Sequence, residues 1–261
     1  MLLNYQQKQM PLNESDQKIE NIFVIHGLFG SLSNLANVAT SLQNDYNIIS
    51  VDLRNHGDSP HSESMSYEEM ANDIFELADT LCIDNFSIIG HSMGGKVAMY
   101  CALQRPERIN RLIIADIAPV KYGNTHQDVF DGLQTLTKNP IKSRQAADDL
   151  LSTTIHNAGI RQFLLKSLAR KEGVFQLKFN LEGIMNNYSS IIDWPNIDAV
   201  FTKPVLFLKG GDSDYILEKY SSSISHLFPN AKAKIISKTG HWLHADKPKM
   251  FNRLVFNFLS Q

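Results

Sequence analysis

Short runs of apolar residues alternate with helical patterns along the first half of the chain. The apolar runs lie at residues 21–25, 46–51, 86–89 and 111–115, and the helical patterns at residues 31–43, 67–81 and 95–103. Runs without polar alternation indicate strands buried on both faces, as in a parallel sheet. Ser66 and Glu69 form a capping box in front of the second helical segment. This order predicts an α/β fold in which a mostly parallel central sheet carries helices on both faces.

The alternation stops between residues 120 and 200. This stretch has helical patterns at residues 143–155, 159–170 and 181–188, and no run typical of a buried strand. We expect an all-helical cap that lies over the functional site; the alternative is that part of the stretch only decorates the sheet. Strands resume at residues 204–208 and 233–236, and residues 249–259 predict a C-terminal helix.

The predicted organisation is therefore a core of residues 1–119 and 201–261 and a helical cap insertion of residues 120–200. A weak pattern at residues 2–6 suggests an additional edge strand. A chain of 261 residues fits one large domain with an insertion better than two independent domains.

Composition and charge narrow the class of protein. A hydrophobic content of 43% with 20% charged residues is ordinary for a globular enzyme, and a net charge of -2 gives no basis for binding nucleic acid or an anionic membrane. No signal-peptide core and no apolar window of membrane-spanning length is present. We expect a cytoplasmic monomer or homodimer that acts on a small molecule, without nucleic-acid or membrane partners.

Residues 90–94 place a serine between two glycines, in the order Gly-His-Ser-Met-Gly. A predicted strand precedes them and a predicted helix follows, which is the context of a G-x-S-x-G nucleophile elbow. In such a turn the strand and helix nearly touch, so the positions two before and two after the serine must lack a side chain. Gly90 and Gly94 meet that requirement. A glycine-rich turn with an incidental serine is the alternative, and the flanking pattern favours Ser92 as a nucleophile.

A serine hydroxyl needs a base within hydrogen-bonding distance. Among nine histidines, His241 is the best candidate because it follows the last predicted strand, directly after a glycine. His244, three residues later, is expected to serve packing instead.

The acid that orients the base is ambiguous, although its loss can cost about 10⁴ in turnover. Asp116 ends the strand after the elbow helix, whereas Asp212 and Asp214 lie in the loop after the next strand. Hydrolases of this kind usually carry the acid three residues beyond a glycine in that later loop. Counting from the pair Gly210-Gly211 gives Ser213 or Asp214, so the residues alone leave all three aspartates open.

The negatively charged oxygen of the reaction intermediate needs preorganised donors. The main-chain N–H of Met93, at the start of the elbow helix, is one candidate. The N–H of Leu28, in the loop after the first buried strand, is the other, and His26 in that loop is expected to be structural. Phe29 and Trp242 flank these loops and are expected to line an acyl pocket, although as isolated aromatic residues they fit ordinary packing equally well.

Taken together, these motifs resemble those of the α/β-hydrolase superfamily. Within it the chain is similar to the small YbfF-type bacterial esterases and their mitochondrial abhydrolase relatives. The matching stretches are residues 26–31, 52–57, 90–96, 116–120 and 240–245.

The resemblance implies an acid and an activity. In YbfF-type esterases the later loop carries a serine where other relatives have aspartate, which here corresponds to Ser213. The resemblance then favours Asp116 as the acid, with Asp214 and Asp212 as alternatives. It implies hydrolysis of short-chain carboxylic esters, or of acyl thioesters, through an acyl-enzyme on Ser92, with no metal or organic cofactor.

Other activities share the same residues. Carbon–carbon bond hydrolysis, lyase chemistry of the menaquinone-pathway kind and cofactor-free haloperoxidation remain alternatives, because the cap sets the substrate. A ligand receptor without activity is a further alternative. Lys166, Arg170 and Lys171 could meet a coenzyme A phosphate, but a solvated helix face is the simpler interpretation.

Overall fold

The computed structural model describes residues 1–9 and 19–261 and contains a seven-stranded sheet in the order β1-β3-β2-β4-β5-β8-β9. The strands are β1 (Tyr5–Lys8), β2 (Asn21–Ile25), β3 (Asn47–Val51), β4 (Phe86–His91), β5 (Ile109–Ala115), β8 (Val205–Gly210) and β9 (Ala231–Ile236). All neighbouring strands are parallel except β1, which pairs antiparallel with β3 at the edge. The predicted parallel sheet is confirmed, and the edge strand lies slightly later than residues 2–6.

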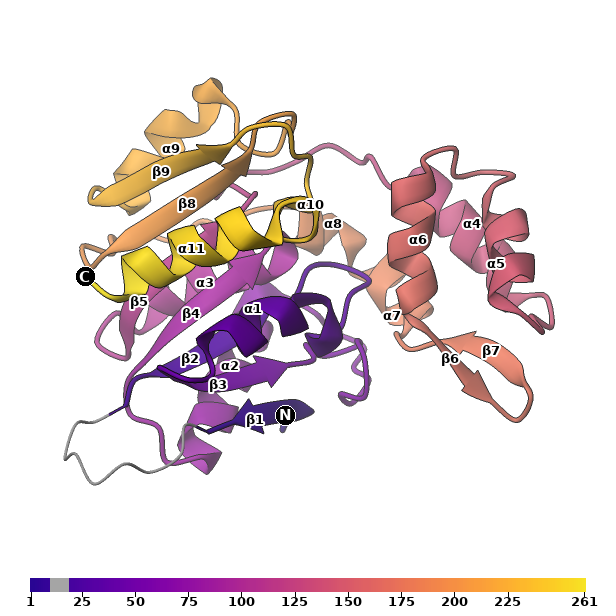
Figure 1. Cartoon of the computed structure of the whole chain (residues 1–261), viewed down its shortest axis with the longest axis horizontal. Helices are drawn as coiled ribbons and strands as arrows, with labels where there is room; N and C mark the ends of the chain where they lie inside the picture. Colours follow the sequence, from indigo (N-terminus) through magenta and orange to yellow (C-terminus); the bar gives the residue numbers. More distant parts are fainter. Residues whose placement is uncertain (10–18) are drawn as a thin grey trace.

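Helices cover both faces of this sheet (Figure 1). One face carries α1 (Ala36–Leu42), preceded by a short 3₁₀ helix at Leu32–Leu35, and α11 (Pro248–Leu259); the other carries α2 (Tyr67–Thr80) and α3 (Met93–Gln104). Further helical turns lie at Glu218–Tyr220, α9 (Ser221–Leu227) and α10 (Leu243–Asp246).

Strand β2 shows why the sequence pattern is continuous rather than alternating. Successive side chains of a strand point to opposite faces. Ile22 and Val24 pack with the residues of α1 and α11, whereas Phe23 and Ile25 pack with those of α2 and α3. Since both faces are covered, every buried position of the strand, from Ile22 to Ile25, is apolar.

Residues 120–200 are called the cap below, and most of them lie beyond one end of the sheet (Figure 1). They contain α4 (Gln127–Thr137), α5 (Arg144–Leu151), α6 (Ala158–Lys166), β6 (Leu168–Lys171), β7 (Val174–Leu177), α7 (Leu181–Asn186) and α8 (Tyr188–Ile192). Figure 1 shows α7 and α8 between the sheet and the rest of the cap.

The expectation of an all-helical cap is wrong. The helix predicted at residues 159–170 ends at Lys166, and β6 and β7 form an antiparallel hairpin. The two residues between them, Glu172 and Gly173, both have positive φ values of 51° and 86°. Two-residue turns of this kind match the twist of a hairpin. Helix α4 was also not expected, although Val129, Leu133 and Leu136 have helical spacing and are buried.

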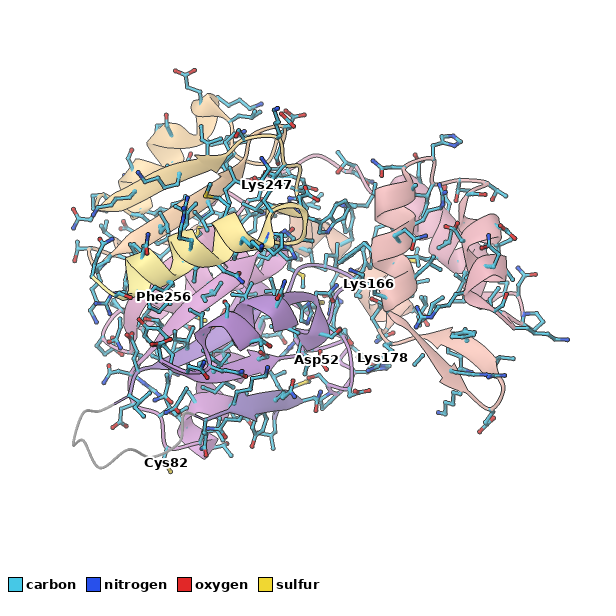
Figure 2. The ribbon with its side chains drawn as sticks, viewed as in Figure 1. Asp52, Cys82, Lys166, Lys178, Lys247 and Phe256 are labelled. Atoms are coloured by element: carbon cyan, nitrogen blue, oxygen red, sulfur yellow. The ribbon has the colours of Figure 1, made fainter. Side chains whose placement is uncertain are left out.

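The cap is attached to the core by polar as well as apolar contacts (Figure 2 labels Lys178, where the two meet). Lys178 Nζ lies 2.9 Å from a carboxylate oxygen of Asp58. The main-chain N–H of Asn180 donates to Asn55 O at 2.8 Å. In the described part of the chain, no helix combines the length and apolar character that crossing a bilayer requires.

The capping box of α2 yields a stability prediction. Ser66 Oγ accepts from Glu69 N, and the Glu69 carboxylate accepts from Ser66 N. Ser66→Ala leaves Glu69 N without its acceptor, while the bond from the residue 66 N–H to the Glu69 carboxylate can remain, and it is expected to lower the free energy of unfolding by about 1 kcal/mol. Urea denaturation measures this. Ser222→Ala, at an exposed position in α9, is the control, and an equal loss in both variants would contradict the prediction.

Candidate active site

The turn between β4 and α3 holds Ser92 in a strained conformation, with φ 54° and ψ −123°. Positive φ is unusual for a residue with a side chain. The turn is fixed because Ser92 N donates to Ala115 O of the adjacent strand at 3.0 Å. A Cβ on Gly90 would lie 2.3 Å from Gly94 O, and a Cβ on Gly94 would lie 2.4 Å from His26 O. The main chains of the strand, the helix and the neighbouring end of β2 are therefore in direct contact here, with no room for a side chain between them.

Three loops bring Ser92, His241 and Asp116 together. His241, after β9, has Nε2 2.9 Å from Ser92 Oγ and Nδ1 2.8 Å from Asp116 Oδ2. The serine and histidine are partly exposed, whereas Asp116 is completely buried. With Nδ1–H donated to the carboxylate, Nε2 is free to accept the serine proton.

Asp116 is surrounded by donors. Gly210 N donates to Oδ1 at 2.9 Å, and Ser213 Oγ donates to Oδ2, the oxygen that also accepts from His241. A buried carboxylate is tolerated when its oxygens are hydrogen-bonded in this way. From the sequence, Ser213 was considered only as the residue that stands where other relatives have aspartate. In the structure its hydroxyl contacts the Asp116 carboxylate.

The alternative acids occupy a different position. Asp212 and Asp214 are exposed, and among the described residues neither makes a hydrogen bond or ion pair with His241. Both line the mouth of the cavity described below. The geometry therefore favours Asp116 over both.

The imidazole of His241 is held by neighbours that sequence reasoning missed. The ring of Tyr215 stacks on it, with centroids 3.9 Å apart. His91 Nε2 lies 2.8 Å from His241 O, and burial keeps the pKa of His91 well below its ordinary value, so this neutral ring donates to the carbonyl. His91 directly precedes Ser92 in the elbow motif, and this position was the feature of the sequence that could have indicated its place beside His241.

His244 packs edge-on against His91, with ring centroids 4.5 Å apart. Burial lowers the pKa of His244 to about 3, so it is uncharged at neutral pH. Its position agrees with the packing role expected from the sequence.

The loop after β2 carries Leu28 and Phe29. Phe29 has a φ of 61°, and its N–H donates to His56 Nε2 at 3.1 Å. His26 accepts from Leu53 N through Nε2 at 3.1 Å, which is a structural contact. Burial lowers the pKa of His56 to about 3, which keeps its Nε2 an acceptor.

The main-chain N–H groups of Leu28 and Met93 are unpaired within the described residues. Met93 begins α3, and the first N–H groups of a helix lack intrahelical acceptors. Both residues line the cavity beside Ser92, so their N–H groups are available to a substrate oxygen.

A cavity of about 570 Å³ opens onto Ser92 and His241. Phe29 and Trp242 both line it, as do apolar side chains from the cap, among them Val129, Ile160 and Phe163. The rings of Phe163 and Trp242 lie 5.3 Å apart and close one wall. The core thus supplies the polar groups and the cap supplies much of the apolar lining.

The basic residues of the cap noted in the sequence do not reach this cavity. Lys166 (labelled in Figure 2), Arg170 and Lys171 are exposed and are absent from its lining. In the described ranges, no group of three or more histidine, cysteine, aspartate or glutamate side chains is arranged to hold a metal ion.

Comparisons with known proteins agree with this geometry. A family model described as the alpha/beta hydrolase fold matches residues 20–248. Esterase YbfF of Escherichia coli is 38% identical, covering 96% of this chain and 100% of its own. The sn-1-specific diacylglycerol lipase ABHD11 of Mus musculus is 39% identical, covering 95% of this chain and 84% of its own.

A solved structure of a marine microorganism esterase is 38% identical and superposes with a TM-score of 0.91, covering 98% of this chain and 99% of that one. At this coverage the similarity includes the cap as well as the sheet.

The close approach at the elbow yields a stability prediction. Gly94→Ala puts a methyl group into main-chain atoms of the β2 end, and we expect the free energy of unfolding to fall by about 1–3 kcal/mol. Gly123→Ala is the matched control, because a Cβ there has no atom within 4 Å. Equal stability of the two variants in urea denaturation would show that the elbow can relax and would refute the crowding argument.

Proposed function

The chain belongs to the alpha/beta hydrolase fold family, and from this premise we propose that it is a serine esterase. It hydrolyses carboxylic esters through an acyl-enzyme on Ser92. The observation that carries this proposal is the hydrogen-bonded series from Ser92 Oγ through His241 to Asp116, which faces an apolar cavity.

In the first half of the reaction, Ser92 Oγ attacks the ester carbonyl while His241 Nε2 takes the hydroxyl proton. Asp116 holds the tautomer that leaves Nε2 unprotonated and stabilises the imidazolium that forms. The oxyanion of the tetrahedral intermediate accepts hydrogen bonds from the N–H groups of Leu28 and Met93. His241 then protonates the leaving alcohol, and the acyl group remains on Ser92.

In the second half, water takes the place of the alcohol. His241 accepts a proton from the water as it attacks the acyl carbonyl, and the same two N–H groups stabilise the second oxyanion. Protonation of Ser92 Oγ by His241 releases the carboxylic acid and restores the enzyme. Removing one oxyanion donor costs about 10²–10³ in rate in serine hydrolases.

Ser213 has a supporting role in this scheme. Its hydroxyl and His241 Nδ1 both donate to Oδ2 of Asp116, while Gly210 N donates to Oδ1. These contacts fix the plane of the carboxylate, and that plane sets the orientation of the imidazole. We assign Ser213 as a positioning residue.

The comparisons support ester substrates. The bacterial relative is named an esterase and the mouse relative a diacylglycerol lipase. Phe29 and Trp242, as lining residues, are proposed to contact the acyl group, and we propose a preference for short chains. Acyl thioesters would react through the same steps. No feature of the described residues favours carbon–carbon cleavage, lyase or haloperoxidase chemistry over ester hydrolysis. The cytoplasmic location and the monomer or homodimer state stay predictions.

The esterase proposal is tested with p-nitrophenyl esters of increasing acyl length. We expect kcat/KM to be highest for short chains and to fall as the chain lengthens, because the aromatic walls bound the cavity. Ser92→Ala should abolish turnover. Folded protein with no turnover at any length would refute the proposal, and turnover that survives in Ser92→Ala would refute the role of Ser92.

The acid is tested with a pair of aspartate variants. Asp116→Asn keeps the shape but favours the wrong histidine tautomer, and we expect kcat to fall by about 10⁴. Asp214→Asn removes an exposed carboxylate that does not contact His241, and we expect kcat to stay within about threefold of the wild type. The reverse ranking would identify Asp214 as the acid.

A further inference from the structure

A lysine lies in the wall of the catalytic cavity, one helical turn beyond the nucleophile. Lys96 belongs to α3, and its side chain is only 1% exposed. It lines the cavity that contains Ser92 and His241, and it is the only lysine or arginine among the described lining residues. The mechanism above does not use it.

The ammonium group contacts oxygen atoms of the cap without an ionic partner. Nζ donates to Asp193 O at 2.7 Å and to Ile192 O at 3.1 Å, at the end of α8. The Asp193 carboxylate is turned elsewhere, accepting from Trp194 N at 2.8 Å and pairing with Lys121 at 3.1 Å. Within the described residues, Lys96 forms no ion pair with any carboxylate at 4.0 Å or less.

Two aromatic faces complete the surroundings of Nζ. The ring centroids of Tyr122 and Tyr67 lie 4.8 Å and 5.6 Å away. A lysine ammonium carries three N–H donors, and only two find acceptors among the described residues. The third N–H has no hydrogen-bond acceptor among the described residues, and Lys96 lines the cavity.

A cation in this position is costly unless something else stabilises it. Burial lowers the pKa of Lys96 to about 7, although Asp193 acts in the opposite direction. Carbonyl oxygens and aromatic faces offset only part of the cost of burying a charge. An anion that accepted the third N–H would supply the missing counter-charge.

We propose that Lys96 binds a carboxylate group of the substrate, so that the preferred esters carry one negative charge. The inference rests on the proposed esterase function and names its substrate class. A single cation among mainly apolar and aromatic walls suits a monoanion better than a phosphate dianion, which needs more positive charge. Asp212 and Asp214 also line the cavity, but they are exposed at its mouth, where water and salt screen their charge.

The carboxylate can belong to either half of the ester. An acyl group with a terminal carboxylate makes the substrate a monoester of a dicarboxylic acid. An alcohol half with a carboxylate makes it an acylated hydroxy acid. Both present the same group to Lys96, and matched substrate pairs distinguish them.

The first pair is monoethyl succinate against ethyl 4-methylpentanoate, in which an isopropyl group replaces the carboxylate. The second pair is 3-acetoxypropanoate against 3-methylbutyl acetate, with the same replacement on the alcohol side. Acid release measured by titration gives kcat/KM for each ester. We expect the charged member of at least one pair to be preferred about tenfold, and the pair that shows the preference identifies the half of the ester.

Lys96→Met, which keeps an unbranched side chain one atom shorter and removes the charge, tests the residue. We expect kcat/KM for the preferred charged ester to fall about 10- to 100-fold, in line with the loss of a hydrogen bond between charged groups. The neutral partner should stay within about threefold. Lys121→Met, at an exposed lysine near the same segment, is the matched control and should change neither member.

Two outcomes would overturn the inference. If the wild type hydrolyses the neutral members of both pairs at least as fast as the charged ones, no carboxylate site exists, and this result needs no variant. If Lys96→Met lowers both members equally, Lys96 only anchors the cap. Hydrolysis of neutral esters in either case leaves the esterase proposal intact, whereas failure to hydrolyse any ester refutes that proposal itself.

Discussion

The close contact between the start of α3 and the end of β2 is the constraint on which the rest of the structure depends. Main-chain atoms of Gly94 and His26 approach so closely that a methyl group would not fit between them. This contact places the first N–H groups of α3 beside the loop that carries Leu28. It also forces Ser92 into its strained turn, with its side chain directed toward His241. The positions of the proposed nucleophile and of the proposed oxyanion donors are thus consequences of one packing arrangement.

Strain recurs at the ends of three strands in the same sheet. Phe29, Ser92 and Asp116 follow β2, β4 and β5, and all three have positive φ. Each is held by a hydrogen bond to another part of the core, from Phe29 N to His56, from Ser92 N to Ala115 O, and from Asp116 N to Leu208 O. Unusual backbone conformations persist where several contacts with the surrounding structure hold them in place. The sheet provides that surrounding, because its central strands, such as β4, are buried on both faces.

Features that depend on residues close together in the sequence could be predicted, whereas features that depend on contacts between distant residues could not. The parallel sheet was predictable because strands such as β2 must be apolar at every buried position, and the elbow was predictable because crowding requires Gly90 and Gly94. The choice among the aspartates depended on the distance between loops that are far apart in sequence, and only the resemblance favoured Asp116. The hairpin of β6 and β7 was missed because short strands at the surface have only a weak sequence pattern. The surroundings of Lys96 were missed because contacts between α3 and the end of α8 leave no pattern in the sequence. The catalytic roles themselves stay predictions.

The peptide units on the two sides of Phe29 connect the core with the cap. Its N–H is bonded to His56 of the core, its carbonyl accepts from Ser167 Oγ of the cap at 2.6 Å, and its ring packs against Phe130 and Phe179 of the cap. The loop that carries the proposed oxyanion donor Leu28 is consequently shaped from one side by the sheet and from the other by the cap. Under the proposed function, cap and catalytic loop are therefore not independent parts. A different cap would have to keep the contacts on Phe29, or the neighbouring N–H of Leu28 would lose its fixed position.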